Sequence, residues 1–543
     1  MARQWVHRLE AWAPWGAGAI LALPVLAFRY PPMGDLAFHE SLVAILRHFG
    51  DPRYFPEGLY RRNLGEPNQL FHAAALALAF VFPTDTSCKI VVALAVLGVA
   101  VGAGHLASHL GATRWTALVV APVGLGWMFR WGLVANMVGF ALWLFALPVL
   151  DQLAKKPSPK HALRATLLTI LLYFGHESSM VVYAIASLIL AIQAPRRWSS
   201  LAWLSCPGAA AAVLAFVYAV RSESLKGASI RAVRNVTMPF AEKVRELPGA
   251  LLSLGSASLP FLVASAAAIA ALVWSPRTGE LPESGERRLL TLARGARFEI
   301  LAFVLLGLYF AMPLTLSGST LIHQRFLAPA FAILVLAVAA RRPSPAWVPA
   351  FAAFPLAMLA LKLGSFGDQD KNYRDLDAVL SRMADRSAVA QLELTPRPPS
   401  VVAPVVGAAA RALAVHGGRL LFSFTDAPAY PVSVPTQFQW NEPVVRLSNN
   451  PYAFLPQHDL RRFRYVLARL ATPGLEAAIV GAFAPEASFV TKAGPWLLFE
   501  SNLPLVSLTE RDEPPSSPLP ESLAQRVQAA LRAKAELGTD PND

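Results

Sequence analysis

The sequence predicts an α-helical membrane protein with about 11 transmembrane helices and a C-terminal α/β domain outside the membrane. Two features of the chain predict this fold. Apolar segments of roughly 20 residues, each long enough to cross a lipid bilayer as a helix, recur between about residues 11 and 365. Only 15% of the 543 residues are charged and the mean hydropathy is +0.43, whereas soluble chains usually carry more charge.

The expected spans follow the runs of apolar residues. We place them at 11–28, 88–108, 115–129, 135–151, 162–175, 178–193, 200–220, 251–274, 298–316, 325–340 and 346–365. A further apolar stretch at 70–82 reaches only roughly 20 Å as a helix, which is short of a hydrocarbon core of about 30 Å. We interpret this stretch as an interfacial or re-entrant segment.

Basic residues in the loops define the orientation, because short cytoplasmic loops of membrane proteins are enriched in Lys and Arg. If 70–82 does not cross the membrane, five basic sets share the cytoplasmic side: Arg3 with Arg8; Lys155, Lys156, Lys160 and Arg164; Arg196 with Arg197; Arg277, Arg287, Arg288, Arg294 and Arg297; and Arg341 with Arg342. The chain beyond 366 is then outside. The same pattern accounts for the net charge of +13, so the bilayer is the expected partner and nucleic acid is excluded.

The chain therefore divides into three parts. Residues 1–366 form the membrane domain, whose long first outside loop covers 29–87. Residues 367–508 form the α/β domain, with strands expected at 388–392, 420–424, 465–468, 488–491 and 496–500 and a helix at 402–415. Residues 509–543 are rich in Pro and in charged residues, and we expect disorder there apart from a weak helix near 521–537.

A cluster of acidic and imidazole side chains, Asp35, His39 and Glu40, lies in the first outside loop. If residues 35–49 form a helix, Asp35 and His39 share one face, and an apolar stripe that includes Phe38 lies on the membrane surface. A carboxylate here can accept the proton of a substrate hydroxyl or bind a divalent cation. The alternative is that Asp35 caps the helix N-terminus, and spacing alone does not separate the two.

A second cluster, His176 and Glu177, forms the tip between two short spans on the same side. Ionisable groups held at membrane depth are candidates for function. Carboxylates with imidazoles suit Mg²⁺ or Mn²⁺, so the expected metal ligands are Asp35, Glu40, His176 and Glu177. The alternative is a hairpin tip in which His176 only forms hydrogen bonds and Ser178 and Ser179 cap the next span.

Two arginines at span ends are candidates for binding a phosphate. Arg325 begins a span, and an arginine at a helix N-terminus suits a phosphate group. Arg130 lies between Trp127 and Trp131, and anchoring at the membrane interface is the favoured explanation there. The candidate substrate-binding residues are accordingly His39, Glu40, His176, Glu177, Arg325 and Arg130.

Several short segments resemble the GT-C membrane glycosyltransferases: 34–39, 47–52, 65–68, 372–376 and 494–500. The layout is also similar, with a long first outside loop, short later loops and an outer α/β domain. The resemblance implies an inverting transferase that uses a sugar linked to polyprenyl phosphate, with Asp35 as the catalytic acidic residue of the first loop. It matches His176 and Glu177 only loosely to a second acidic loop, which often carries two carboxylates.

This resemblance implies a bacterial inner-membrane enzyme with a periplasmic C-terminal domain. The acceptor (a glycan, a lipid or a protein) stays open, as does a Mg²⁺ or Mn²⁺ cofactor. The rival is a non-catalytic membrane protein, either an assembly factor for cell-envelope polysaccharide or a transporter. A transporter is expected to hold ionisable groups near mid-span in two related halves, a pattern that this sequence does not show.

Overall fold

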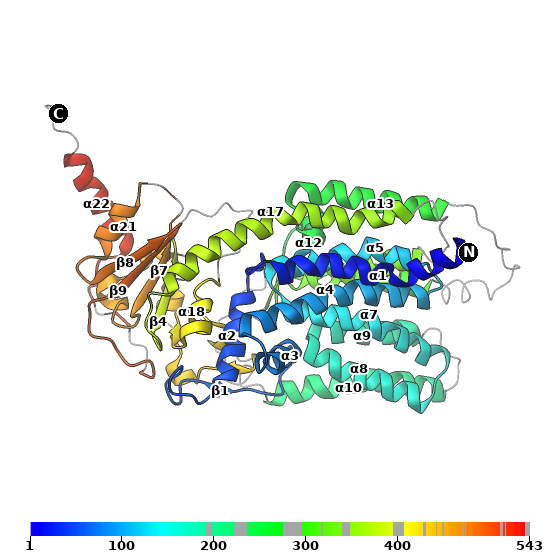
Figure 1. Cartoon of the computed structure of the whole chain (residues 1–543). Coiled ribbons are helices and arrows are strands. Elements are labelled where there is room, and N and C mark those ends of the chain that lie inside the picture. Colours follow the sequence, from blue (N-terminus) through cyan, green and yellow to red (C-terminus); the bar gives the residue numbers. More distant parts are fainter. Residues whose placement is uncertain are drawn as a thin grey trace, which may run out of the picture. The chain divides into compact units, whose positions relative to one another are not determined.

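The structure is a computed structural model that describes residues 2–191, 198–221, 236–274, 296–316, 319–338, 348–394, 407–426, 430–440, 442–447, 450–470, 472, 474–510, 514–515 and 517–537. The chain forms two compact units, whose elements are labelled in Figure 1. The helical unit comprises Met1–Pro31, Gly65–Ala74 and Lys89–Phe366, and the mixed unit comprises Pro32–Leu64, Ala75–Cys88 and Gly367–Asp543. The basic segments at 196–197, 277–294 and 341–342 lie outside the described residues.

Long apolar helices build the helical unit. They are α1 (Ala2–Ala27), α4 (Thr84–His109), α7 (Val134–Lys155), α8 (Pro159–Gly175), α9 (Glu177–Leu190), α10 (Trp198–Arg221), α12 (Phe240–Leu252), α13 (Ser258–Trp274), α15 (Arg297–Ala311), α16 (Leu327–Val338) and α17 (Val348–Leu380). Within the described ranges, five helices are long and apolar enough to cross a membrane, or six if one bent pair is a single span. The stretch expected at 70–82 forms α3 (Leu70–Ala79), which is short, as its sequence predicts.

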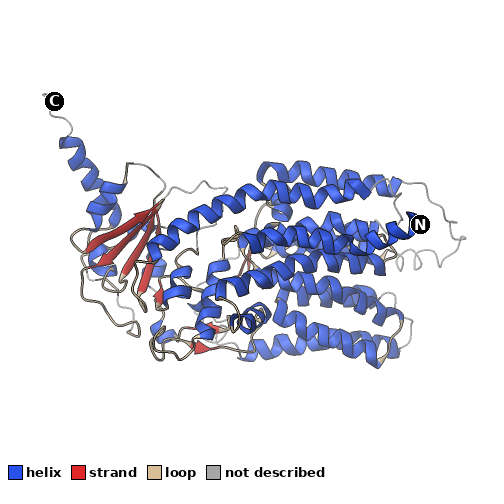
Figure 2. Cartoon of the chain, in the orientation of Figure 1, coloured by secondary structure: helices blue, strands red, loops and turns tan. Residues whose placement is uncertain are grey.

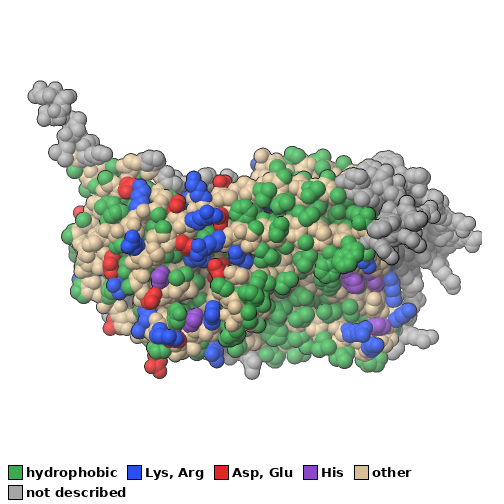
Figure 3. All heavy atoms as spheres, viewed as in Figure 1, with side chains coloured by type: hydrophobic (Ala, Val, Ile, Leu, Met, Phe, Trp, Pro, Cys, Tyr) green, Lys and Arg blue, Asp and Glu red, His purple; other side chains and the backbone are tan. Residues whose placement is uncertain are grey.

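Large apolar side chains lie on the surface of these helices. Leu163 and Leu167 of α8 and Phe303 of α15 are each more than half exposed. Figure 3 shows hydrophobic side chains spread over the middle of the helical unit, whereas charged side chains lie on the mixed unit and at one end of the helical unit. Soluble proteins rarely expose so large an apolar area, so this surface indicates a unit that lies in a bilayer.

The span expected at 115–129 is wrong as a continuous helix. The segment forms four short pieces: η1 (Arg114–Thr116), α5 (Ala117–Val120), η2 (Ala121–Leu125) and α6 (Trp127–Trp131). Pro122 cannot donate a backbone hydrogen bond, and a Cβ on Gly126 would lie 2.2 Å from the Leu251 carbonyl oxygen. Irregular backbone is tolerated at membrane depth where protein surrounds it, and residues 116–129 are buried.

The span expected at 251–274 is also interrupted, because α12 and the segment that leads into α13 meet at a bend of 100°. The buried Lys243 of α12 donates hydrogen bonds to the carbonyls of Phe310 and Met312, at 2.7 and 2.6 Å. These carbonyls lie at the end of α15, where no intrahelical donor is available. Lys243 therefore closes the C-terminus of α15 and ties α12 to it.

One buried carboxylate joins three helices of the helical unit. Asp151 of α7 is fully buried, and its oxygens lie 2.7 Å from His109 Nε2 of α4 and 2.8 Å from Arg297 Nε of α15. Lys155, one turn further along α7, adds a third contact at 2.8 Å. A buried carboxylate is stable only when its charge is compensated and its oxygens are hydrogen-bonded, so these contacts fix the spacing of the three helices.

The mixed unit contains a five-stranded sheet, shown in red in Figure 2, with the strand order β5-β4-β7-β9-β8. The strands are β4 (Ala388–Glu393), β5 (Arg419–Leu420), β7 (Tyr465–Arg469), β8 (Ala487–Ala493) and β9 (Trp496–Ser501). β4 is parallel to β5 and β7, whereas β7–β9 and β9–β8 are antiparallel. Four of the five expected strands are confirmed. The one at 420–424 is wrong beyond Leu420, because Phe424 already begins the 3₁₀ turn η7 (Phe424–Asp426).

Most of the first outside loop, residues 32–64 and 75–87, belongs to the mixed unit. Its helix α2 (Leu36–Arg47) packs against α18 (Ala410–His416), and β1 (Arg61–Arg62) pairs antiparallel with β6 (Val432–Ser433). Phe38 and Leu42 are buried, so the expected membrane-facing stripe is wrong. The stripe packs inside a protein core because α18 offers it an apolar surface. Of the helix expected at 402–415, residues 402–406 lie outside the described part.

The C-terminal tail contains a helix that packs on the mixed unit. α22 (Leu523–Leu537) places Leu523 and Val527 in the core of the mixed unit, packed near α21 (Glu476–Phe483). Arg526 of α22 lies 2.6 Å from a carboxylate oxygen of Glu486. The expected helix near 521–537 is confirmed, but the α/β domain extends beyond the expected boundary at 508, because the apolar face of α22 completes its core.

We predict that Asp151→Ala strongly destabilises the protein. The change leaves His109 and Arg297 without their shared carboxylate, and removing one partner of a buried ion pair lowers the free energy of unfolding by about 3–5 kcal/mol. Thermal unfolding of the detergent-solubilised protein measures the loss. Glu299→Ala is the control, since Glu299 lies on α15 near Arg297 and has no ion pair among the described residues. Equal losses for the two variants would contradict the prediction.

Candidate functional site

The tip between α8 and α9 is shaped by His176. Its backbone N–H donates to the Leu172 carbonyl at 2.8 Å and ends α8, while its ring Nδ1 accepts the Ser178 N–H at 3.1 Å and caps α9. His176 is buried. Because Nδ1 accepts a backbone hydrogen bond, the neutral ring carries its proton on Nε2. His176 thus has a clear structural role, and Ser178 is not the residue that caps α9.

Arg325 reaches this tip from η5 (His323–Phe326), the 3₁₀ turn that leads into α16. Its Nη1 lies 3.5 Å from His176 Nε2 and 3.6 Å from Glu177 Oε1, and its side chain is 12% exposed. Asn136 of α7 donates to Ser178 Oγ at 3.0 Å and extends the polar cluster. The structure therefore brings together three of the expected residues, His176, Glu177 and Arg325.

A small pocket opens beside Arg325. Its polar lining is Asn136, Ser178, Ser179 and Arg325, and its apolar lining is Phe140, Trp143, Val182 and Pro329. A few polar groups placed on an apolar wall are the usual lining of a small-molecule site. The positive charge of Arg325 favours an anionic group there.

Two glycines allow α7 to approach the tip closely. A Cβ on Gly139 would lie 2.7 Å from Ser179 Oγ and 2.8 Å from His176 Cβ, and a Cβ on Gly175 would lie 3.3 Å from Gly139 Cα. Small residues at such crossings let membrane helices pack at short range. Gly139 therefore fixes the position of His176 relative to α7.

The turn at 65–69, which carries part of the resemblance to GT-C enzymes, supports the tip from another side. The Asn68 N–H donates to the Tyr173 carbonyl at 3.2 Å, and Asn68 Oδ1 accepts the Glu177 N–H at 2.9 Å. Asn68 has a φ of +66°, a conformation that asparagine tolerates better than most residues. The buried Glu66 of this turn was not among the sequence candidates, although the 65–68 segment pointed to it.

Asp35 lies at the start of α2 in the mixed unit, but its carboxylate does not cap the helix. Within the described residues it has no hydrogen bond or ion pair. Burial raises the pKa of its carboxyl to about 7. A group with a pKa near the working pH is suited to proton transfer. The interpretation of Asp35 as a proton acceptor is therefore favoured over its interpretation as the cap of α2.

His39 and Glu40 are held by different parts of the mixed unit. The His39 ring packs against Phe424 at 5.1 Å between ring centroids. Glu40 is buried, and its carboxylate lies 3.8 Å from Arg411, which also donates to Asp377 at 2.6 Å. The His39 N–H donates to the Asp35 carbonyl at 3.2 Å in the first turn of α2, but no hydrogen bond joins the two side chains in the described part of the chain. His39 and Glu40 therefore have packing roles that the spacing did not predict.

Asp426 of η7 is a further acidic group that the sequence did not single out. Burial raises the pKa of its carboxyl to about 6, although the charge of Arg419 opposes the shift. The Ser423 N–H donates to its Oδ2 at 3.2 Å. Sequence reasoning missed it because the segment was expected to continue as a strand. Arg130 of α6 shares no hydrogen bond or ion pair with the His176 cluster in the described residues.

The expected metal ligands do not fit a dication well. Of the four, Glu40 is paired with Arg411, and His176 Nε2, which carries the proton of the neutral ring, lies 3.5 Å from the guanidinium of Arg325, whose charge repels a cation. The ligands Asp35 and Glu40 belong to the mixed unit, whereas His176 and Glu177 belong to the helical unit. Binding of Mg²⁺ or Mn²⁺ by these residues stays a prediction, and the proposed reaction does not require it.

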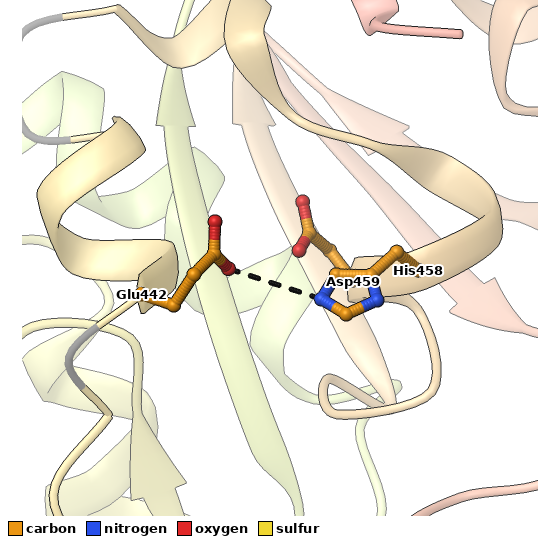
Figure 4. A group of neighbouring side chains, drawn as sticks. All are labelled: Glu442, His458 and Asp459. Atoms are coloured by element: carbon orange, nitrogen blue, oxygen red, sulfur yellow. Dashed lines mark ion pairs between the residues drawn. The ribbon is translucent and has the colours of Figure 1, made fainter. Parts of the chain in front are cut away.

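A separate acidic group in the mixed unit, Glu442, His458 and Asp459, has ligand atoms within 4.8 Å of one another (Figure 4). Arg446 already occupies its centre, donating to Asp459 at 2.6 and 2.9 Å and to Glu442 at 2.7 and 3.1 Å. The arginine supplies the charge that a metal ion would bring. This cluster is therefore an ion-pair network that holds α19 (Glu442–Leu447) against α20 (Pro456–Asp459).

No family model and no curated protein matches the chain. Among solved structures, ArnT from Cupriavidus metallidurans, in its apo state, is similar with a TM-score of 0.50 and 12% sequence identity. The alignment covers 92% of this chain and 98% of ArnT. The likeness shows an ArnT-like fold and confirms the expected fold class, a mostly helical chain with several apolar helices and a small C-terminal sheet domain.

We predict that Asp35→Asn raises the thermal stability of the protein at pH 8 more than at pH 4.5. The folded state raises the carboxyl pKa from 3.8 to about 7, so between these values it binds more protons than the unfolded state. Stability then falls as the pH rises through this window, and the amide removes the effect. Melting temperatures at the two pH values measure it. Asp368→Asn, at an exposed position, is the control. An unchanged difference between the pH values would rule out the raised pKa.

Proposed function

We propose that the protein is an inverting glycosyltransferase that moves a sugar from a polyprenyl-phosphate donor to an acceptor hydroxyl at the outer face of a bacterial inner membrane. The GT-C-like fold and the bilayer-facing helices support the class of reaction. The observation that carries the proposal is Asp35, an unpaired carboxyl with a pKa of about 7 in the first outside loop.

In the proposed reaction, the Asp35 carboxylate accepts the proton of the acceptor hydroxyl. The acceptor oxygen forms a bond to the anomeric carbon while the bond from that carbon to the phosphate oxygen breaks, so the configuration inverts. The phosphate leaves with the electron pair and gains a negative charge. A positioned general base contributes about 10²–10⁴-fold to such a rate.

Arg325 is the proposed ligand of the leaving phosphate. Its guanidinium lines the pocket beside Asn136 and Ser178, so one cation and two neutral polar groups lie on the wall where the phosphate is proposed to bind. Charge-assisted hydrogen bonds from arginine to phosphate are stronger than neutral ones. The acceptor is proposed to bind the mixed unit, which carries Asp35 and lies outside the membrane in the expected topology.

We predict that Asp35→Asn lowers turnover at least 100-fold and that Arg325→Met lowers it about tenfold or more. The assay uses the purified full-length protein with radiolabelled polyprenyl-phosphate hexose and pentose donors, and scores both transfer and hydrolysis. Asp368→Asn and Lys160→Met, both at exposed positions, are the matched controls.

An Asp35→Asn variant as fast as the wild type would end the assignment of the base. If the wild type neither turns over these donors nor binds polyprenyl phosphate by native mass spectrometry, the non-catalytic assembly role is the better explanation. Binding without turnover on any donor also counts against the transferase.

A further inference from the structure

Four aromatic side chains of the mixed unit, Phe38, Phe422, Phe424 and Tyr430, form one aromatic patch. The ring of Phe424 stacks on those of Phe38 and Tyr430, with centroids 4.7 and 4.5 Å away. The ring of Phe422 meets that of Phe38 edge to face, with centroids 5.5 Å apart. Phe38 is buried, whereas Phe424 and Tyr430 are partly exposed and Phe422 is 50% exposed. The patch therefore has one ring in the protein core and three that solvent reaches.

The aromatic patch adjoins Asp35. Phe38 lies three positions after Asp35, on the same side of the first turn of α2. A Cβ on Gly407 would lie 3.0 Å from the Phe38 ring and 3.2 Å from the Gly34 carbonyl oxygen, which belongs to the peptide bond that leads into Asp35. The ring of Phe38 and the backbone of Asp35 thus lie side by side. Asp35 is itself partly exposed, so the carboxyl and the exposed rings belong to one region of one unit.

The turns that carry the rings are held by hydrogen bonds. Asn63 of the first outside loop donates from Nδ2 to the Tyr430 carbonyl at 3.1 Å and from its N–H to the Pro431 carbonyl at 2.9 Å. The Val434 N–H donates to the Thr425 carbonyl at 2.8 Å and ties η7, which begins at Phe424, to the chain after β6. A surface that is ordered before binding loses little conformational freedom when a ligand binds.

Exposed rings beside a carboxyl suit a sugar. The face of an aromatic ring carries partial negative charge, whereas the axial C–H bonds of a pyranose are polarised by the neighbouring oxygens and are attracted to it. Small-molecule sites combine aromatic walls with a few polar groups. Here the polar groups are Asp35 and the exposed Arg61 of β1, which donates to Ser433 Oγ at 3.0 Å, three residues after Tyr430. A charged arginine at its border makes the patch a poor surface for an acyl chain.

We infer that the exposed rings of Phe422, Phe424 and Tyr430 bind a sugar ring of the acceptor and turn one of its hydroxyls toward Asp35. The acceptor of the proposed transferase is then a glycan, and not a lipid or a protein without sugar. The inference rests on the proposed function for the role of Asp35, but the binding of a sugar to the rings does not require turnover.

Saturation-transfer NMR on the full-length protein, in a detergent without sugar, tests the binding. The probes are the methyl glycosides of glucose, galactose, mannose and N-acetylglucosamine, with a peptide that contains Ser and Thr and a short-chain diacylglycerol as the alternative acceptors. We expect a glycoside to bind, and Phe422→Leu, which stays apolar but loses the flat ring face, to weaken the binding about tenfold. Tyr430→Leu should have the same effect, and Phe422→Tyr should retain binding.

Phe489→Leu is the matched control, because Phe489 is an exposed phenylalanine, 43% exposed, on β8 of the same unit. Its glycoside binding should equal that of the wild type. The melting temperature of each variant shows whether a loss of binding comes from unfolding, and the retained binding of Phe422→Tyr separates stacking from simple apolar packing.

Glycoside binding that both leucine variants weaken supports the sugar subsite, even if no donor is turned over and the proposed function fails. Transfer to a glycoside that is equally fast in the wild type and both leucine variants at limiting acceptor keeps the transferase and overturns the subsite. Binding of none of the glycosides, or of the peptide or the diacylglycerol alone, also overturns it.

Discussion

Backbone hydrogen bonding at helix ends is the constraint on which the helical unit depends. In a bilayer no water is available to the last carbonyls and first N–H groups of a helix. The protein meets the constraint with side chains. His176 caps α9 after ending α8, and Lys243 donates to the carbonyls that end α15. The irregular stretch from 116 to 129 meets it by being buried inside protein.

The same constraint orients the candidate site. Because the Nδ1 of His176 accepts the Ser178 N–H, the ring plane is fixed and Nε2 is directed at Arg325. The close contact of Gly139 with the tip then holds this arrangement against α7. The neutral ring of His176 adds no charge, so the positive charge at the tip lies on the guanidinium of Arg325, 3.6 Å from Glu177 Oε1. The geometry around Arg325 thus follows from the way that two short helices are joined.

The sequence predicted most local structure and little of the pairing between distant segments. Apolar runs marked most of the long helices, and alternating or β-branched runs marked β4, β7, β8 and β9. Pro122 and Gly126 broke the run at 115–129, which hydropathy alone reads as a span. The pairing of Arg61 with Ser433, and of Glu40 with Arg411, joins residues more than 300 positions apart, and one sequence contains no signal for such contacts.

For the same reason the sequence located the site residues but not their roles. His176, Glu177 and Arg325 were selected because ionisable groups at span ends are rare, and they do meet in the structure. The support of Glu177 by Asn68 depends on a turn 109 positions away. Phe38 packs against Phe424, with ring centroids 4.7 Å apart. The helical periodicity predicted that the Phe38 face of the helix is apolar, but it could not predict what that face contacts.

The carboxylates of Asp35 and Glu40, at the start of α2, show that the surroundings of a side chain, and not its spacing in the sequence, decide which chemical role it can have. Asp35 and Glu40 are five residues apart in one acidic cluster, and either could serve as a base or a ligand on sequence grounds. The charge of Glu40 is compensated by the buried Arg411, so its carboxylate is a poor proton acceptor. Asp35 is also largely buried but has no cation beside it, and the pKa of its carboxyl rises to about 7. Surroundings that set one carboxyl apart from its neighbour are the pattern from which acid–base roles are proposed, and they favour Asp35 over Glu40 as the proposed base.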